Sequence, residues 1–180
     1  SKKYYVERID IFGNFQTIEE VIRNNLVVDE GDPLNNVLYN KSIDKIRNLG
    51  FFKEVSSEVV DGSNENLKII NIRVEEQPTG EISMGAGYGS SGSTIGAGIV
   101  EKNFLGKGIN LNTNFELTEE SLKGQFIFSK PYFNYSENTL RTSLKAITTD
   151  NLDDFGYKQS ETGFSIGTTF EQYENIFFSP

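Results

Sequence analysis

Glycine-rich stretches are the first places where this sequence could do chemistry. Gly87, Gly89 and Gly92 spell G-x-G-x-x-G, the spacing of a loop that cradles a dinucleotide phosphate. That loop works only where a strand turns into a helix, because the phosphate sits on the helix N-terminus. Here apolar residues recur at every second position on both sides of the glycines, which predicts a β-hairpin over residues 81–100. Gly106-Lys107-Gly108 lacks the Ser or Thr that a P-loop needs.

Side chains that could carry catalysis are scarce. The chain has no Cys and no His, so thiolate metal sites, the commonest metal ligand and the usual general base are all missing. Adjacent carboxylates remain, but they lie beside turn residues, where such pairs are normally solvated. These pairs are Asp29-Glu30, Glu75-Glu76, Glu119-Glu120 and Asp153-Asp154. We therefore predict no enzyme activity, no metal and no cofactor, and the formal charge of -9 argues against a nucleic-acid partner.

The first half of the chain carries the elements of a small α+β domain. A strand at residues 4–11 ends at Gly13, and Thr17 with Glu20 predicts a capping box that opens a helix. A second helix stops at Gly50, and strands at 51–60 and 67–76 follow. The order β-α-α-β-β predicts a helix pair packed on one three-stranded sheet. Phe51 and Phe52 are expected in its core rather than in an exposed binding patch.

From Gly80 onward the period is two, without helical spacing. The clearest segment is 109–117, where Ile, Leu, Thr and Phe alternate with Asn and Glu. We expect about six antiparallel strands joined up-and-down, each near the 9–11 residues that a tilted strand needs to cross a bilayer. No run of about 18 apolar residues predicts a membrane-spanning helix.

The connections between these strands favour a membrane sheet over a soluble sandwich. Alternate connections lie at the same end of an up-and-down sheet, and those rich in Phe and Tyr are NFLGKG, KPYFNYSEN and EQYENIFF. The intervening ones, SSGS, TEES and TDNLDDFGYK, are mostly small or acidic. One aromatic rim and one polar rim are typical of a transmembrane β-barrel.

Together the two halves resemble the Omp85 family. The first half is similar to a POTRA domain, with Gly13-Asn14 after the first strand and Leu49–Phe52 (LGFF) after the second helix. The second half is similar to the start of an Omp85 barrel, with GAGYGSSG, NFLGKG and KPYF in order. The resemblance implies a POTRA domain at 1–78 and the N-terminal strands of an incomplete transmembrane β-barrel at 79–180. Because the chain opens with SKKYY, without Met, we expect it to begin inside a longer protein.

The resemblance also implies a function and its site. The family's barrel-assembly members fold and insert outer-membrane proteins by adding strands at a Gly-rich first barrel strand, the lateral gate. In this chain the gate would be Glu81, Ile82, Ser83, Met84, Gly85, Ala86, Gly87, Tyr88 and Gly89. Strand glycines weaken the hold on a neighbouring strand, although they could also serve only curvature or close approach.

Other implied residues lie outside the gate. Gln77, Pro78, Thr79 and Gly80 form a candidate hinge, and Glu30-Gly31 is a candidate docking site for partners, although a solvated turn would look the same. The implied partners are outer-membrane protein substrates, accessory lipoproteins of the assembly machinery and the lipid bilayer. The implied location is the bacterial outer membrane, with the POTRA domain in the periplasm.

Three alternatives stay open at this point. Translocation-and-assembly and two-partner-secretion transporters share the Omp85 architecture. A soluble two-domain adhesin or carbohydrate-binding protein, with its aromatics as sugar platforms, comes from a different class. A six-strand sheet would also have two open edges, so we expect the chain to self-associate or to pair with another chain.

Overall fold

The computed structural model describes residues 3–89, 92–151, 156–173 and 176–178. The chain divides into two compact units, Ser1–Thr79 with Leu105–Lys107, and Gly80–Phe104 with Gly108–Pro180. The short segment Leu105–Lys107 thus groups with the first unit although it lies in the second half of the sequence. The domain boundaries that the sequence suggests, 1–78 and 79–180, stay a prediction.

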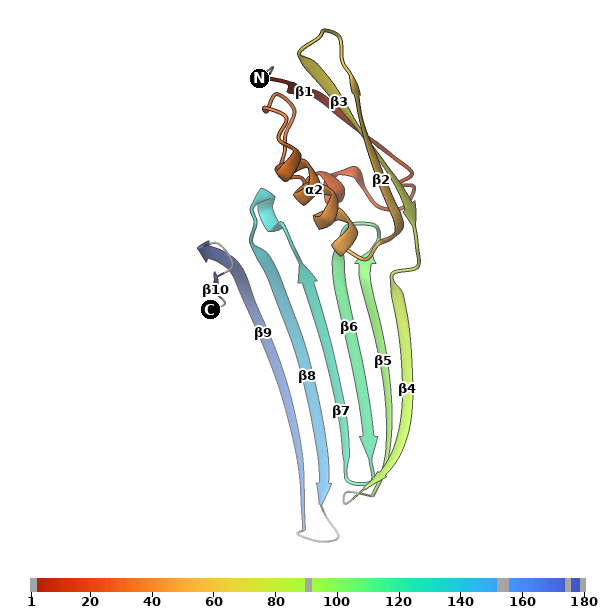
Figure 1. Ribbon diagram of the computed structural model, residues 1–180. Coiled ribbons are helices and arrows are strands. Elements are labelled where there is room, and N and C mark those ends of the chain that lie inside the picture. Colours follow the sequence, from red (N-terminus) through yellow and green to blue (C-terminus); the bar gives the residue numbers. More distant parts are fainter. Residues whose placement is uncertain (1–2, 90–91, 152–155, 174–175, 179–180) are drawn as a thin grey trace. The chain divides into compact units, whose positions relative to one another are not determined.

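The first unit has the predicted order of elements. These are β1 (Tyr5–Phe12), α1 (Glu19–Arg23), α2 (Asn36–Asn48), β2 (Phe52–Asp61) and β3 (Leu67–Glu76). The sheet order is β1-β3-β2, so β3 lies in the middle, parallel to β1 and antiparallel to β2 (Figure 1).

A single aliphatic core holds this unit together. Ile9 and Ile72 from the sheet pack with Ile22 and Ile46 from the helices, all at most 2% exposed. Phe51 and Phe52 are buried, as predicted, with their rings edge to face and their centroids 6.2 Å apart. Burial of aliphatic side chains is the main stabilising contribution to such a small domain.

The two helices begin differently. The side chain of Asn35 accepts the N–H groups of Val37 and Leu38 and so caps α2, and Gly50 follows that helix with a φ of +71°. The capping box predicted for Thr17 and Glu20 is wrong, because the N-cap of α1 is Ile18, with no side-chain cap. The helix is also short, at five residues.

The second unit is one antiparallel sheet. Its strands are β4 (Gly80–Gly89), β5 (Gly92–Phe104), β6 (Ile109–Thr118), β7 (Ser121–Lys130), β8 (Thr139–Asn151), β9 (Tyr157–Tyr173) and β10 (Ile176–Phe178). Each pairs with the next along the chain, so that the six predicted strands form a meander and β10 adds three residues to it (Figure 1). Ser90 and Ser91 of the first predicted connection, and residues 152–155 of the fifth, lie outside the described residues.

Two of the predicted aromatic connections are described. Phe104, at the end of β5, is 40% exposed, and Phe133, in the 3₁₀ helix Phe133–Tyr135, is 41% exposed. Both lie at the same end of the sheet, because β5 and β7 run in the same direction. The side chains of the last aromatic connection, from Glu171 onward, lie outside the described residues.

Candidate functional site

The predicted gate residues Glu81–Gly89 all lie in β4, an outer strand of the second sheet. Among the described residues β4 pairs with β5 alone, in an unbroken antiparallel register from Gly80↔Glu101 to Gly89↔Gly92. All ten residues of β4 are exposed, and Ile82, Met84 and Tyr88 are 75%, 82% and 86% exposed. A strand with a free edge presents unpaired N–H and C=O groups that can bind another strand.

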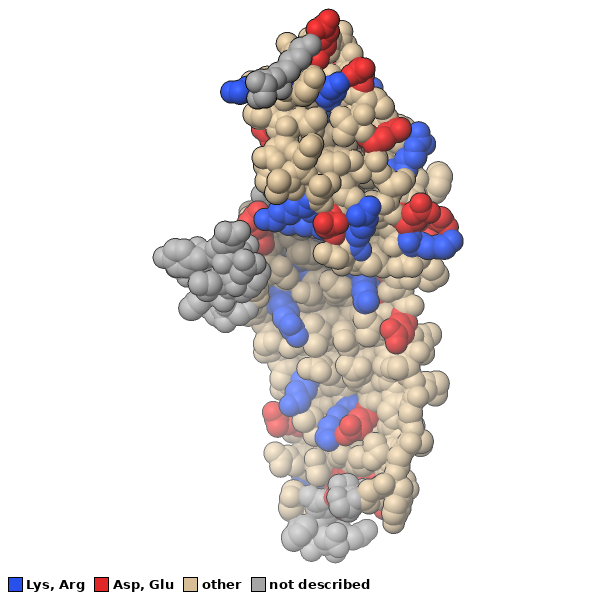
Figure 2. Space-filling model, viewed as in Figure 1, with Lys and Arg blue, Asp and Glu red and all other residues tan. Residues whose placement is uncertain are grey.

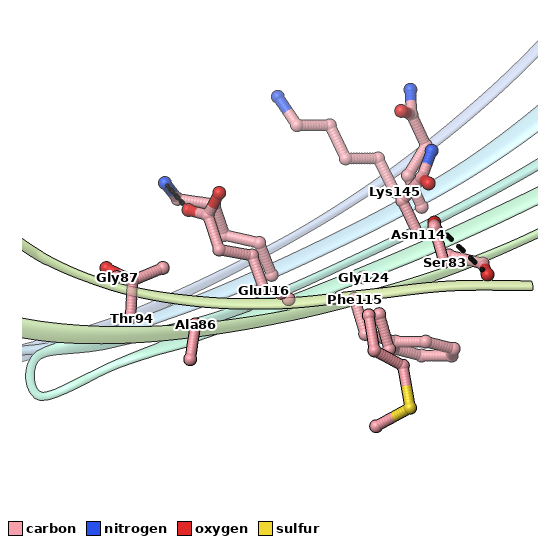
Figure 3. Close-up of a pocket in the computed structure, with 16 residues that line it drawn as sticks. Ser83, Ala86, Gly87, Thr94, Asn114, Phe115, Glu116, Gly124 and Lys145 are labelled. Atoms are coloured by element: carbon pink, nitrogen blue, oxygen red, sulfur yellow. Dashed lines mark hydrogen bonds and ion pairs between the residues drawn. The ribbon is translucent and has the colours of Figure 1, made fainter.

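The sheet has one apolar and one polar face. Because register places paired residues on the same face, Met84, Ala97 and Phe115 form a row on the apolar face. Ser83, Gly98 and Asn114 form the neighbouring row on the polar face, which continues through Gln125 and Lys145. Figure 3 shows Ser83, Asn114 and Lys145 on one side of the ribbons and Phe115 on the other. This two-faced pattern is typical of a barrel wall.

Glycine removes side chains from the polar face of β4. Gly85, Gly87 and Gly89 point there, and a Cβ atom added to any of them would find no atom within 4 Å. Gly98 in β5 is different, because an added Cβ would lie 2.7 Å from Ser83 Oγ and 2.8 Å from Asn114 Oδ1. On this face β4 therefore has a bare backbone at Gly85, Gly87 and Gly89, whereas Gly98, which pairs with Ser83, is already covered by side chains.

Charges on the polar face are paired or dispersed. Lys123 Nζ donates to Glu116 Oε1 at 2.8 Å, and both side chains are about half exposed. Figure 2 shows acidic and basic side chains scattered over a mostly uncharged surface. In the described part of the chain no group of three or more His, Cys, Asp or Glu side chains could hold a metal ion. None of the described helices is long and apolar enough to cross a membrane.

The candidate hinge is held at its first residue. The backbone N–H of Gln77 donates to the carbonyl of Phe51 at 3.1 Å, and its side-chain amide donates to the carbonyl of Gly50 at 3.0 Å. Gly80 is already the first residue of β4. Gln77, Pro78 and Thr79 are the residues between β3 and β4, and a hinge at 77–80 stays a prediction.

Glu30 and Gly31 both make hydrogen bonds to β1. Glu30 Oε1 accepts the N–H of Ile9 at 2.9 Å, and the N–H of Gly31 donates to the carbonyl of Val6 at 2.7 Å. Arg23 adds a donor to the carbonyl of Ile9 at 2.9 Å. This loop therefore covers the outer edge of β1. Glu30 is still 45% exposed at its side chain, so it also presents a charge to solvent.

Glu76 is an organising residue that sequence reasoning missed. Its carboxylate accepts the backbone N–H groups of Phe15, Gln16 and Thr17, with the shortest distance, 2.7 Å, to Thr17. Burial of the carboxyl raises its pKa, but these hydrogen bonds more than offset burial, so the pKa of Glu76 lies below its ordinary value. The sequence holds no signal for this contact, because the partners are 59 to 61 residues apart.

A β-α-α-β-β domain followed by an amphipathic antiparallel meander with a glycine-rich first strand defines a class, the POTRA-containing outer-membrane β-barrel proteins. The sequence model of the POTRA family, described as a surface antigen variable number repeat, matches residues 4–77. The chain belongs to the Omp85 family and is BamA-like.

Relatives and solved structures give this assignment its detail. The chain is 38% identical over 107 residues to the outer membrane protein assembly factor BamA of Neorickettsia risticii, covering 59% of this chain and 14% of that protein. A putative outer membrane protein assembly factor of Treponema pallidum is 28% identical over 99% of this chain and 22% of its own length. The chain thus spans a quarter or less of these two relatives.

Solved structures agree over nearly the whole chain. BamA from Haemophilus ducreyi lacking POTRA domains 1–3 superposes with a TM-score of 0.85 at 28% identity, covering 98% of this chain and 34% of that one. CdiB from Escherichia coli superposes with a TM-score of 0.64 at 14% identity, covering 97% of this chain and 34% of that one. The second likeness shows the shared fold alone.

Proposed function

We propose that this chain is part of the central subunit of an outer-membrane β-barrel assembly machinery. In this role β4 is the lateral gate, and it captures strands of outer-membrane protein substrates by β-augmentation. The observation that carries the proposal is the glycine content of β4, the first strand of the sheet, where Gly85, Gly87 and Gly89 leave one face of the backbone without side chains. The relatives named outer membrane protein assembly factors support it.

Strand capture at β4 does not require a chemical reaction. Backbone N–H and C=O groups in lipid must be paired, so a free edge at bilayer depth strongly favours an added strand. Main-chain hydrogen bonds supply affinity without demanding one partner sequence, which suits diverse substrates. Glycine in β4 weakens its hold on β5 by roughly 0.5–1 kcal/mol per residue, which makes exchange of partners easier. The proposed protein is therefore an insertion factor and not an enzyme.

The first unit is proposed to work in the periplasm as a docking domain. The outer edge of β1 is occupied by the loop at 30–34, since Val6 N–H also donates to the carbonyl of Asp32 at 2.9 Å. Among the described residues β2 pairs with β3 alone, so we assign nascent substrate strands to the outer edge of β2. We assign accessory lipoproteins to the Glu30-Gly31 surface, and the bilayer to the apolar face of the second sheet.

Substitution of Glu30 tests the lipoprotein assignment. Glu30→Gln keeps an oxygen that can accept the N–H of Ile9 but removes the charge. Lipoprotein co-purification with the full-length protein should fall, while amide exchange in β1 stays unchanged. Asp29→Asn is the matched control, because it removes a neighbouring charge from the same loop. Unchanged co-purification with Glu30→Gln would remove this surface from the proposal.

A polypeptide transporter is the second candidate function. The fold shared with CdiB is compatible with it, and at 14% identity that likeness shows the fold alone. A soluble adhesin is the third candidate function, and dependence of the purified chain on detergent would count against it. If the chain is isolated, its open sheet edges are expected to produce self-association.

Crosslinking in the full-length protein tests the gate directly. The chain has no Cys, so single cysteines at positions 82–88 report without background. A stalled substrate barrel would carry one cysteine in its C-terminal strand. Adducts whose partner position shifts in register along β4 support the gate. Adducts confined to the first unit would assign substrate handling to the POTRA domain instead.

A further inference from the structure

Three of the four glycines of β4 lack a conformational reason within the described structure. Glycine is required where φ is left-handed or where a Cβ atom would collide with a neighbour. Gly92, for example, has a φ of +80°. Gly85, Gly87 and Gly89 have no left-handed φ and have empty space where a Cβ atom would lie. An alanine would fit at each of these positions as the structure stands.

The empty space continues across the neighbouring strand. Gly96 pairs with Gly85, and a Cβ atom there would meet only the carbonyl oxygen of Phe115, at 3.7 Å. We call the polar-face surface over Gly85, Gly87 and Gly96 the glycine slot. It forms part of an open hollow of about 720 Å³. In Figure 3, Thr94, Glu116 and Ser83 stand around this surface.

We propose that the glycine slot receives an aromatic side chain, preferentially tyrosine, from the strand that pairs with β4. This inference rests on the proposed function, because it needs a strand at the free edge. Neighbouring strands lie about 4.8 Å apart, so a ring on the polar face of an added strand can lie sideways over Gly85. The slot then selects among substrate strands by one side chain, in addition to the unselective main-chain pairing.

The same sheet already contains one such arrangement. Phe115 in β6 pairs directly with Gly124 in β7, and its ring atoms Cδ1 and Cε1 lie 3.5 Å from where a Cβ atom of Gly124 would be. An aromatic ring laid over a glycine on the next strand shields the bare backbone and restores packing. An added strand at β4 would offer the glycine slot the same cover, but on the polar face.

Polar neighbours of the slot favour tyrosine over an aliphatic side chain. A hydroxyl at the tip of the ring can reach hydrogen-bonding groups, and Thr94, Gln125 and the Glu116–Lys123 pair line the same hollow. Lys145 also lines the hollow and is exposed, which adds a positive charge to its wall. A side chain with an apolar body and a polar end matches this surface best.

Two peptides test the slot on the full-length protein in lipid nanodiscs. They are identical strands, except for tyrosine or serine at the position opposite Gly85. Each also has one cysteine, which pairs with an Ile82→Cys variant on the apolar face of β4. Disulfide formation in a glutathione buffer then reports relative affinity. We expect about tenfold more adduct with the tyrosine peptide.

Three variants distinguish side-chain binding in the glycine slot from main-chain pairing at the edge of β4. Gly85→Val fills the slot from β4, and Gly96→Phe fills it from β5 without altering β4. With both variants, the ratio of adduct formed by the tyrosine peptide to adduct formed by the serine peptide should move towards one. Ala86→Val is the matched control, because it places the same valine side chain on the opposite face of β4, and it should keep the ratio. A preference that survives both slot-filling variants would overturn the proposal.

Failure of the slot and failure of the gate give different results. If the protein without a slot-filling substitution forms equal amounts of adduct with both peptides, the proposed tyrosine preference is overturned. Strand capture at β4 would remain intact. An absence of adducts with either peptide, for cysteines placed at each of positions 82–88, would overturn the proposed function itself.

Discussion

Glu76 Oε1 accepts the backbone N–H of Thr17 at 2.7 Å, which ties the end of β3 to the loop before α1. The same carboxylate accepts the N–H groups of Phe15 and Gln16. It therefore satisfies three backbone donors of the loop that precedes α1, from a distant part of the chain. It also precedes Gln77, which is itself bonded to Phe51, so the segment that leads into β4 starts from a fixed point.

Glu76→Gln should loosen this loop. Hydrogen bonds to a charged acceptor contribute about 1.5–3 kcal/mol, and the amide offers one acceptor oxygen instead of two. Hydrogen exchange of the amides of residues 15–17 in the full-length protein should accelerate at neutral pH. Glu75→Gln is the matched control, because Glu75 meets Lys53 at 2.8 Å on the exposed surface, where ion pairs contribute little. Equal acceleration in both variants would refute this role.

The contribution of Glu76 should also depend on pH in a defined direction. Its pKa is lower in the folded protein than in the unfolded chain, so the ionised form favours folding. The contribution is complete above the unfolded pKa and is lost as pH falls through the folded pKa. Protection of residues 15–17, corrected for intrinsic exchange, should therefore fall only once the pH drops below the ordinary pKa of a glutamate. The Glu76→Gln variant should lack this component of the pH dependence.

Periodicity predicted the strands well because side-chain alternation is a direct consequence of the β pleat. The register-dependent contacts could not be predicted in this way. Whether a glycine is covered depends on which residue lies across from it, as Phe115 lies across from Gly124. The failed capping box has the same origin, because the distant carboxylate of Glu76 accepts the N–H of Thr17, which the side chain of Glu20 was expected to accept. Local sequence patterns therefore predict the helices and strands, whereas the contacts of the site depend on which distant segments pair.

Two glycines in the first unit should respond very differently to the same substitution. Gly13→Ala would place a Cβ atom against the carbonyl oxygen of Val74, on a backbone with a φ of +91°. Gly50→Ala has a left-handed φ of +71° but open space around the new atom. We expect Gly50→Ala to cost about 1 kcal/mol of unfolding free energy and Gly13→Ala to cost well over that. Urea denaturation of the two variants, monitored by limited proteolysis of the first unit, measures the difference in unfolding free energy.

Gly98→Ala should weaken the pairing of β4 with β5. The new Cβ atom would crowd Ser83 Oγ and Asn114 Oδ1, which lie 2.7 and 2.8 Å from its position. Faster amide exchange in β4 is the expected result, and removal of the crowding hydroxyl by Ser83→Ala should restore part of the protection. Gly96→Ala serves as the comparison, because its Cβ atom meets one backbone oxygen at 3.7 Å. Equal exchange in the two alanine variants would contradict the crowding argument.

Phe115 and Gly124 should be energetically coupled. Phe115→Ala removes the ring that lies over Gly124, so it exposes backbone as well as losing apolar contact. In a Gly124→Ala background the new methyl group already covers that backbone. The cost of Phe115→Ala should therefore be smaller there, by about 0.5–1.5 kcal/mol. Urea-induced unfolding of the four proteins in detergent micelles gives this double-mutant cycle.

A distant aromatic residue on the same face provides the control for this coupling. Phe164 in β9 pairs with Leu144 and is 65% exposed, and its register does not bring it to Gly124. Substitutions at sites that share no contact are additive to within about 0.3–0.5 kcal/mol, so Phe164→Ala should cost the same with and without Gly124→Ala. If Phe115→Ala is equally additive, the ring contributes only its own apolar area, and the aromatic cover proposed for the glycine slot loses its precedent in this sheet.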